Sequence, residues 1–429
     1  MIRTILSHRY FKNASWLMAD KVYRLAVGFI VMSFLARHLG PEEFGLYTYI
    51  QTFTLLFYGL YSFGIDGVLV KHLLSPKYNT EDTLRTALSL KIIASFIGST
   101  VVILSAQLLN DESVKLPIIL LSISLIFQST NVFDYHFQAR VLGKKSALAQ
   151  SSAFTISSAV KLIAIWQSAD LFTLSLLLSV DALVLSAAFI IAFIKSEGYF
   201  PALKIDRQIA RDLLSQSWPL IFSSTAVLLQ ARVDQIMLKS LAPASELGFY
   251  AVALLCIEAA AFPAAIMKQA LTPAVVNAKN NDHSIYLERM TNLYRLSFLF
   301  FFASAAAVVS LSEIGIEIFF GAAFAPAATL LSIYSFRLFF SYATIARSTY
   351  VMIENLLPYA LFTLIFGTLI NVVANYYLIP ALHAKGAILA TLISFSVPIF
   401  VLDIFHKKMH TNTRTMIKAL LSPHKVSLR

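Results

Sequence analysis

Ionisable side chains inside long apolar stretches are the residues of this chain whose types and positions indicate chemistry. The arginines among them are Arg24, Arg232 and Arg337. A guanidinium is planar and donates paired hydrogen bonds, so a desolvated arginine is well suited to bind phosphate. Charges in an apolar environment are costly, and each is therefore a candidate for function unless a structural ion pair accounts for it.

Arg337 has the most informative surroundings, because polar residues recur around it at spacings of three and four. The members of this stripe are Tyr334, Arg337, Ser341, Thr344 and Ser348. Such spacing places them on one face of a helix, and a polar face on an apolar helix turns toward water or toward the interior of a bundle. We expect Arg337 to line a cavity, with a buried structural ion pair as the alternative.

The other cations each leave two interpretations open, binding of an anion and structural pairing. Arg24 lies about 13 Å along its helix from the nearer end, and Asp20 is placed one turn earlier, where it can neutralise Arg24. Arg232 and Asp234 are separated by about 200° around a helix, so at least one of them needs a partner on another helix. Lys161 follows a second polar stripe, but its side chain can also extend to the membrane interface.

Three carboxyl groups in the apolar stretches are candidates for binding a proton or a sodium ion. Asp181 lies midway along one stretch, Glu258 precedes the kink expected at Pro263, and Asp234 follows Arg232. A buried carboxyl can release and rebind a proton when its surroundings change. For Asp181 the alternative is an ion pair with Lys161 across the hairpin that joins their helices.

Other polar residues in or near the apolar stretches receive simpler interpretations. Four charged residues close to the ends of their helices are expected to be solvated at the interface, namely Asp20, Lys21, Asp134 and Asp403. Asn371 and Asn375 lie one turn apart, and we expect them mainly to form hydrogen bonds between helices.

The sequence argues against an enzyme and against a metal or cofactor site. It contains no HExxH, Walker A or nucleophile-elbow motif. Cys256 is the only cysteine, which excludes an internal disulfide, a CxxC metal site and a redox pair. The net charge of +11 would suit nucleic acid only if the basic residues clustered on a soluble face. We therefore expect no catalytic residue, cofactor, metal or nucleic-acid partner.

The elements that position these residues follow from composition. With 58% hydrophobic residues, 13% charged residues and a mean hydropathy of +0.72, the chain is far more apolar than a soluble protein. About 20 apolar residues cross a bilayer as a helix, and backbone groups cannot remain unpaired there. The prediction is an all-α membrane protein with about twelve transmembrane helices. The predicted spans are 16–37, 45–64, 87–109, 116–138, 147–167, 171–194, 218–240, 248–270, 293–312, 326–346, 357–379 and 386–405.

Charge asymmetry in the connecting segments predicts the orientation of the chain. If the N-terminus is cytoplasmic, the cytoplasmic segments together with the adjoining ends of the spans contain 25 Lys and Arg, and the opposite side, counted in the same way, contains four. This bias follows the positive-inside rule and places both termini in the cytoplasm. The first fourteen residues lack the apolar core and cleavage site of a signal peptide, so we expect the first helix to be retained.

A motif recurs after six predicted helices. The segments 39–47 and 241–250 match, with one insertion, as L-x-P…G-x-Y. A parallel repeat predicts two six-helix lobes around a central cavity. The alternative is that short loops share Pro and Gly simply as turn residues. The expected organisation is an N-terminal lobe over 1–194, a cytoplasmic linker over 195–217, a C-terminal lobe over 218–405 and a basic cytoplasmic tail over 406–429.

Four stretches resemble the polysaccharide-transporter branch of the multidrug/oligosaccharidyl-lipid/polysaccharide flippase superfamily, in particular O-antigen flippases. They are LARHLGPEEFGLYTYIQTF, ARVDQIMLKSLAPASELGFYAVA, FFGAAFAPAATLLSIYSF and NVVANYYLIPALHAKGAILATLIS. They follow the order of the family and extend over nearly the whole chain.

The resemblance implies a flippase in the cell inner (plasma) membrane. Its substrate would be a polyprenyl-pyrophosphate-linked oligosaccharide, such as an O-antigen repeat unit of lipopolysaccharide, moved from the cytoplasmic to the periplasmic leaflet by alternating access. The expected partners are the lipid bilayer, a proton or sodium ion, a polysaccharide polymerase and a chain-length regulator. The residues expected to bind the substrate are Arg24, Arg232, Arg337 and Lys161, and those expected to bind the ion are Asp181, Glu258 and Asp234.

The alternative is a cation-coupled multidrug exporter of the same superfamily. A cationic cargo would favour a cleft lined by carboxylates. The three deep arginines favour an anionic cargo instead.

Overall fold

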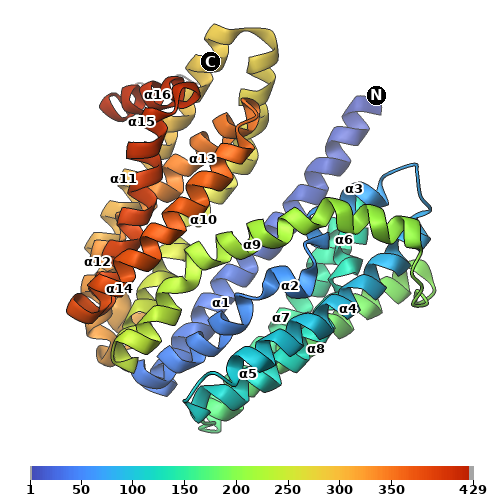
Figure 1. Cartoon of the computed structure of the whole chain (residues 1–429), viewed down its shortest axis with the longest axis horizontal. Helices are drawn as coiled ribbons and strands as arrows, with labels where there is room; N and C mark the ends of the chain where they lie inside the picture. Colours follow the sequence, from blue (N-terminus) through green and yellow to red (C-terminus); the bar gives the residue numbers. More distant parts are fainter. Residues whose placement is uncertain (1, 425–429) are drawn as a thin grey trace. The chain divides into compact units, whose positions relative to one another are not determined.

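The computed structural model describes residues 2–424, and helices account for nearly all of them (Figure 1). No β-strand occurs in this described range. The prediction of an all-α fold is therefore confirmed.

The chain forms two compact units. Unit 1 comprises the residues up to Leu39 together with Leu46–Leu229, and unit 2 comprises Gly40–Gly45 together with the chain from Gln230 onward. Gly40–Gly45 thus belongs to unit 2, although its neighbours on both sides belong to unit 1. Helix α9 (Arg207–Leu241) begins in unit 1 and continues into unit 2.

Unit 1 is built on long helices with short turns between them. Its elements are α1 (Ile2–Leu55), α2 (Tyr58–Ser62), η1 (Ile65–Gly67), α3 (Leu69–Leu73), α4 (Thr80–Ala106), α5 (Glu112–Ser124), η2 (Leu125–Asn131), α6 (Val132–Ala139), α7 (Gly143–Trp166), α8 (Leu171–Glu197) and the first part of α9. Asp170 caps α8 by accepting a hydrogen bond from the backbone N–H of Thr173. Phe133, Phe193 and Leu213 are buried together in a core built from α6, α8 and α9.

Unit 2 follows the same plan. Its elements are the end of α9, α10 (Ala244–Asn281), α11 (His283–Phe320), η3 (Ala322–Phe324), α12 (Ala325–Tyr334), α13 (Arg337–Ile353), α14 (Leu357–Ser396), η4 (Val397–Leu402), α15 (Asp403–Phe405), η5 (Lys407–Met409) and α16 (His410–Leu421). Aromatic rings join α11 to α13 in its core. Phe298 stacks on Phe339 with ring centroids 5.4 Å apart, and Tyr294 stacks on Phe298 at 5.9 Å.

The predicted spans all coincide with helical segments, but the boundaries between the observed helices differ from those of the predicted spans. Eight described helices are long and apolar enough to cross a membrane, or nine if the bent pair α12–α13 is one span. Two of these eight contain a non-helical residue, Gly40 in α1 and His383 in α14, so each consists of two helices in sequence. The predicted span 218–240 lies in α9, which does not meet the same test of length and composition.

Several predicted spans are also bent or interrupted. The 3₁₀ segment η2 interrupts the predicted span 116–138, and the break between α12 and α13 bends the predicted span 326–346 by 40°. At that break, Ser335 donates its hydroxyl hydrogen to the carbonyl oxygen of Ser332, a contact that often accompanies helix bending. Near Pro398 the last span becomes the π-helix η4, because proline lacks the N–H that a regular turn needs.

The repeated motif packs against itself inside unit 2. A Cβ atom added to Gly248 on α10 would overlap the carbonyl oxygen of Pro41, and one added to Gly45 would lie 2.7 Å from the carbonyl oxygen of Ala244. Both glycines have helical backbone angles, so they are required for close helix contact rather than for a turn.

Candidate functional site

Arg337 lies at the bend, as the first residue of α13. Its guanidinium carbon is 5.4 Å from the centre of the Tyr334 ring and 5.9 Å from that of Phe395, within the range of cation–π contact. Its side chain forms no hydrogen bond or ion pair with any residue in the described part of the chain. The predicted stripe is therefore discontinuous, because Tyr334 ends α12 and Arg337 begins the next helix.

Arg24 is neutralised by its own helix. Its guanidinium binds both carboxylate oxygens of Asp20, with the shortest distance 2.8 Å. Ser151 on α7 donates a further hydrogen bond to Asp20, at 2.7 Å. Asp20 is buried, so the expectation that interfacial water solvates it is wrong. The ion pair and the serine hydroxyl satisfy this carboxylate instead.

Arg232 has its partner on another helix. Its guanidinium lies 3.0 Å from a carboxylate oxygen of Glu258 on α10. Both side chains remain partly exposed, at 24% for Arg232 and 38% for Glu258. This pair and the different surroundings of Asp234 agree with the angular separation predicted for Arg232 and Asp234.

Lys161 and Asp181 form the ion pair that the sequence offered as one alternative for both residues. The Lys161 ammonium donates to a carboxylate oxygen of Asp181 across the α7–α8 hairpin. Tyr47 also contacts Lys161. The lysine is therefore held inside unit 1.

Asp234 lies at the centre of a buried polar network in unit 2. Its carboxylate accepts hydrogen bonds from the hydroxyl of Tyr250 at 2.7 Å, the amide of Asn375 at 2.6 Å and the hydroxyl of Thr391 at 2.5 Å. These donors come from α10 and α14, and Asn375 in turn donates to Asn371. Asp234 is 1% exposed, and none of these donors carries a positive charge.

The network is incomplete in its amide groups. The side-chain nitrogen of Asn371 and the side-chain oxygen of Asn375 are buried without a hydrogen-bond partner. Buried polar atoms are normally paired. The unpaired oxygen of Asn375 belongs to the same network as the carboxylate of Asp234. The network therefore contains oxygen atoms that could bind a cation or a proton.

A chain of contacts connects this carboxylate to Arg337. The hydroxyl of Tyr250 lies 2.9 Å from that of Tyr334, and the ring of Tyr334 faces the Arg337 guanidinium. Tyr250 and Tyr334 are both buried. Two side chains therefore link the unpaired cation with the buried anion of unit 2.

Sequence reasoning missed further ion pairs, among them one with a buried member in each unit. In unit 1, buried Lys91 on α4 lies 2.5 Å from Asp66 in the broken segment η1. In unit 2, Arg347 on α13 binds both oxygens of Asp403, at 2.7 and 2.8 Å. Asp403 is 1% exposed, so the expectation of interfacial solvation is wrong for it too. No spacing signal identifies these pairs, because their members belong to different helices.

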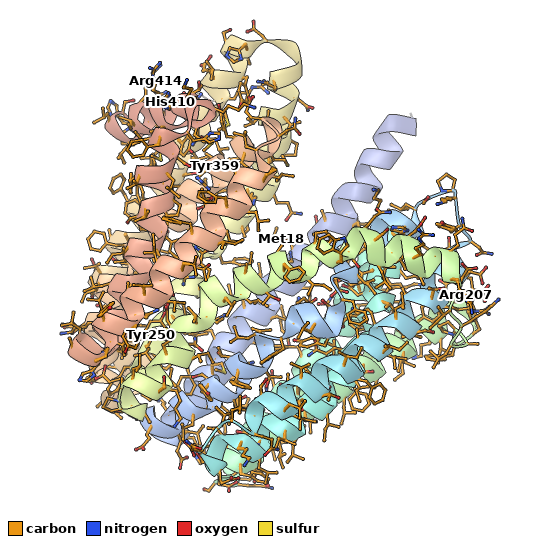
Figure 2. All side chains as sticks on the ribbon, in the orientation of Figure 1. Met18, Arg207, Tyr250, Tyr359, His410 and Arg414 are labelled. Atoms are coloured by element: carbon orange, nitrogen blue, oxygen red, sulfur yellow. The ribbon has the colours of Figure 1, made fainter. Side chains whose placement is uncertain are left out.

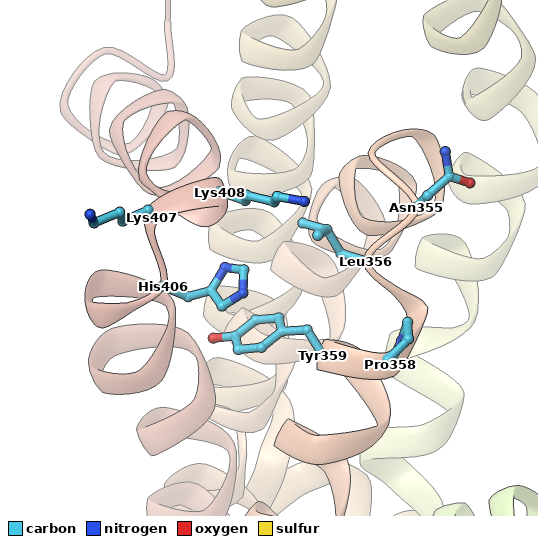
Figure 3. A pocket seen from close by; sticks show the side chains of 7 residues that line it. All are labelled: Asn355, Leu356, Pro358, Tyr359, His406, Lys407 and Lys408. Atoms are coloured by element: carbon cyan, nitrogen blue, oxygen red, sulfur yellow. The ribbon is translucent and has the colours of Figure 1, made fainter.

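A cavity of about 380 Å³ in unit 2 is lined by residues that include Tyr359, His406 and Lys408 (Figure 3). His406 stacks on Tyr359 at its base, with ring centroids 4.0 Å apart, and Lys408 extends over it. Tyr359 donates its hydroxyl hydrogen to Asp403. Tyr359 and Tyr250 lie toward opposite ends of unit 2 (Figure 2), so this cavity is separate from the Asp234 network.

No cluster of three or more His, Cys, Asp or Glu side chains that could hold a metal occurs among the described residues. Of the deep charged groups that the sequence singled out, Arg24, Arg232 and Lys161 are in ion pairs, Arg337 contacts aromatic rings and Asp234 lies in a network of neutral donors.

Comparison with known proteins gives a family match and several structural matches. The family model described as polysaccharide biosynthesis protein matches residues 10–278. No curated protein sequence matches the chain.

Solved structures of the MOP (multidrug/oligosaccharidyl-lipid/polysaccharide) superfamily have a similar fold. The lipid II flippase MurJ in an inward closed conformation matches with a TM-score of 0.67 and 11% identity, covering 95% of this chain and 91% of MurJ. An inward-facing multidrug resistance MATE transporter matches at 0.69 and 14%, covering 97% and 98%. A MOP superfamily transporter from Pyrococcus furiosus matches at 0.62 and 12%, covering 97% and 96%. At these identities the similarity is one of fold.

Proposed function

The chain belongs to the polysaccharide biosynthesis protein family, and from this premise we propose that it flips a polyprenyl-pyrophosphate-linked oligosaccharide between membrane leaflets. The cargo is an O-antigen repeat unit or a similar surface glycan. It moves from the cytoplasmic to the periplasmic leaflet of the inner membrane by alternating access of two lobes, 1–194 and 218–405. Both termini of the chain lie in the cytoplasm.

The observation that supports the proposal most directly is the set of groups around the Arg337 guanidinium. Its guanidinium has aromatic neighbours and no anionic partner in direct contact, among the residues that the structure describes. A desolvated arginine whose hydrogen-bond donors are not occupied by a carboxylate favours an anionic ligand. Its planar fork matches the oxygen atoms of a pyrophosphate.

The other cations have a secondary part in this proposal. Arg24 and Arg232 are paired with Asp20 and Glu258, so a pyrophosphate must compete with a carboxylate to bind either arginine. Lys161 is paired with Asp181 in the same way. These pairs would exchange partners as the substrate passes.

Asp234 is the strongest candidate for ion coupling. Asp181 and Glu258 each contact a cation, whereas the hydrogen-bond donors around Asp234 are neutral. A buried carboxylate that no cation contacts directly can accommodate a proton or a sodium ion without first losing an ion pair. The tyrosine pair between Asp234 and Arg337 gives the ion a physical route by which its binding affects the anion site.

Transport of the lipid-linked substrate by the purified chain tests the proposal. Proteoliposomes would contain a polyprenyl-pyrophosphate-linked oligosaccharide, and its exposure to a membrane-impermeant glycosidase would be followed over time. We expect exposure to increase only when the chain is present. Protein-dependent movement of a cationic dye, with no movement of the oligosaccharide, would establish the multidrug alternative and reject the flippase.

The translocated lipid-linked oligosaccharide would be used at the periplasmic surface. A polysaccharide polymerase and a chain-length regulator are the proteins expected to act on it there. In cells, loss of the chain would then reduce surface glycan and leave its lipid-linked precursor on the cytoplasmic leaflet.

A further inference from the structure

A groove of about 630 Å³ runs along the surface of unit 1 between α7 and α8. Small side chains form its floor, including Ala149 and Ala188, and the exposed side chains of Ile156 and Ile191 form parts of its walls. Its volume is within the range of about 300–1,000 Å³ that is usual for ligand sites. Most of its lining is apolar, so an ion or sugar alone would not fill it.

Two lysines define one end of the groove. Lys145 is near the start of α7 and Lys195 is near the end of α8, and both line the groove. Lys145 donates a hydrogen bond to the hydroxyl of Ser196 at 2.6 Å, which fixes its ammonium at this end. Lys195 is exposed and has no hydrogen bond or ion pair with any described residue.

Neither lysine forms an ion pair with a described carboxylate. Glu197 lies 3.2 Å from a guanidinium nitrogen of Arg140 and 3.3 Å from the ring of His136, and it accepts a hydrogen bond from Ser196 at 3.1 Å. Glu197 therefore reaches Lys145 only through the Ser196 hydroxyl, and its direct contacts are with two other basic groups. The groove end keeps a positive charge that a phosphate would complement.

The length of the groove matches one membrane leaflet. From Lys145 to Ile156 the α7 backbone rises about 17 Å, and half of the hydrocarbon core of a bilayer is about 15 Å thick. A phosphate held by the lysines would thus leave an acyl chain alongside the apolar part of the groove. A polyprenyl chain is much longer than one leaflet and fits this length less well.

We propose that the α7–α8 groove is a binding site for an anionic phospholipid, with its phosphate between Lys145 and Lys195 and one acyl chain along the groove. The site is independent of the proposed transport activity. By the charge asymmetry of the chain, it would take its lipid from the cytoplasmic leaflet, where a basic pocket between helices meets anionic headgroups.

Lipid titration of the purified full-length chain in detergent tests this site. Dioleoylphosphatidylglycerol and dioleoylphosphatidylcholine would be added separately, with binding followed by native mass spectrometry and by the unfolding midpoint. A ligand of the folded state raises that midpoint by mass action. We expect phosphatidylglycerol to bind more tightly than phosphatidylcholine, and glycerol phosphate, which lacks the chains, to have no effect.

Variants separate the headgroup from the chain. The double variant Lys145→Gln/Lys195→Gln should lower the affinity for phosphatidylglycerol by about tenfold, toward that for phosphatidylcholine. Ala187→Phe, at an exposed lining position, should weaken binding of both lipids by filling the groove. Lys144→Gln is the matched control, because Lys144 lies over the Trp16 ring and does not line the groove.

Three results would overturn the proposal. Unchanged phosphatidylglycerol binding in the double variant would place the lipid elsewhere. An equal loss of affinity in Lys144→Gln would show that the loss follows from the lower net charge of the protein and not from lysines in the groove. Tighter binding of a polyprenyl phosphate than of phosphatidylglycerol would assign the groove to the transported substrate instead.

Discussion

The guanidinium of Arg337 differs from the other deep cations in what surrounds it. Arg24, Arg232 and Lys161 each contact a carboxylate, whereas Arg337 contacts the rings of Tyr334 and Phe395. Aromatic faces stabilise a cation without occupying its hydrogen-bond donors. Those donors therefore remain available to a ligand.

Replacement of Arg337 gives the most direct test at the scale of one residue. Arg337→Ala should reduce transport by more than about tenfold, because a desolvated phosphate loses a charged hydrogen-bond partner. Arg337→Lys keeps the charge but not the fork, so it should retain part of the activity. Surface glycan and the abundance of the protein in membranes would be measured together, with Arg24→Ala beside them. Normal glycan in Arg337→Ala at normal abundance would remove Arg337 from the substrate path.

Asp234 gives the corresponding test for coupling. Asp234→Asn keeps the size of the side chain but removes its charge, so transport in liposomes should lose its dependence on a proton or sodium gradient. Asp181→Asn and Glu258→Gln are the matched comparisons, and we expect them to retain more of the dependence because their carboxylates are paired. A gradient response of Asp234→Asn equal to that of the wild type would place coupling at another group.

At the scale of the element, the glycines of the repeated motif allow the two copies of the motif to pack closely. Gly248 leaves room for the backbone of Pro41, and Gly45 leaves room for that of Ala244. Two chain segments that are about 200 positions apart can approach this closely only without side chains between them. Their packing also accounts for the assignment of Gly40–Gly45 to unit 2.

Added methyl groups test this contact. Gly248→Ala should destabilise the chain by about 1–3 kcal/mol, because a backbone atom of Pro41 must move. Gly315→Ala is the control, since its added Cβ would meet no atom within 4 Å, and a helical alanine is favourable. The unfolding midpoints in detergent would be compared. Equal midpoints for the two variants would show that the contact at Gly248 can relax.

The start of α8 provides a test with a pH dependence. The hydrogen bonds that Thr173 donates hold the pKa of Asp170 below its ordinary value. A carboxyl whose pKa is lower in the folded state stabilises the fold above its unfolded value of about 4, and this stabilisation disappears as the pH falls through the folded pKa. Asp170→Ala should therefore lower the unfolding midpoint at pH 7, and the difference should shrink in acid. A difference that stays constant with pH would mean that the charge of the cap has no part in it.

At the scale of the whole molecule, the orientation in the membrane is the testable feature. Reporter fusions at Lys204 and Lys425 should report a cytoplasmic location, and a fusion at Glu246 should report an external one, because the predicted topology puts 25 basic residues on one side and four on the other. Lys425 lies beyond the described residues. A periplasmic signal at Lys425 would require an odd number of membrane crossings and would contradict the twelve-span prediction.

The apolar spans, the helical fold and the repeated motif follow from the sequence by itself. Transfer of a segment into lipid depends on its own composition, and hydrogen bonding within a helix is local, so both can be evaluated without knowledge of the other segments. The helix breaks could be anticipated only in part. Pro41 marks one of them, whereas no proline lies at the break before Arg337.

Only the tertiary structure decided which charges are paired. Asp20 with Arg24 lies within one helix and could be anticipated, but Arg347 and Asp403 are 56 positions apart, in segments whose rotation about their axes the sequence does not specify. A bend or a small rotation of either helix would change the partner. Helix packing, rather than composition, also decides that the hydrogen-bond donors of Arg337 are left without a carboxylate partner. It likewise brings donors from α10 and α14 to Asp234.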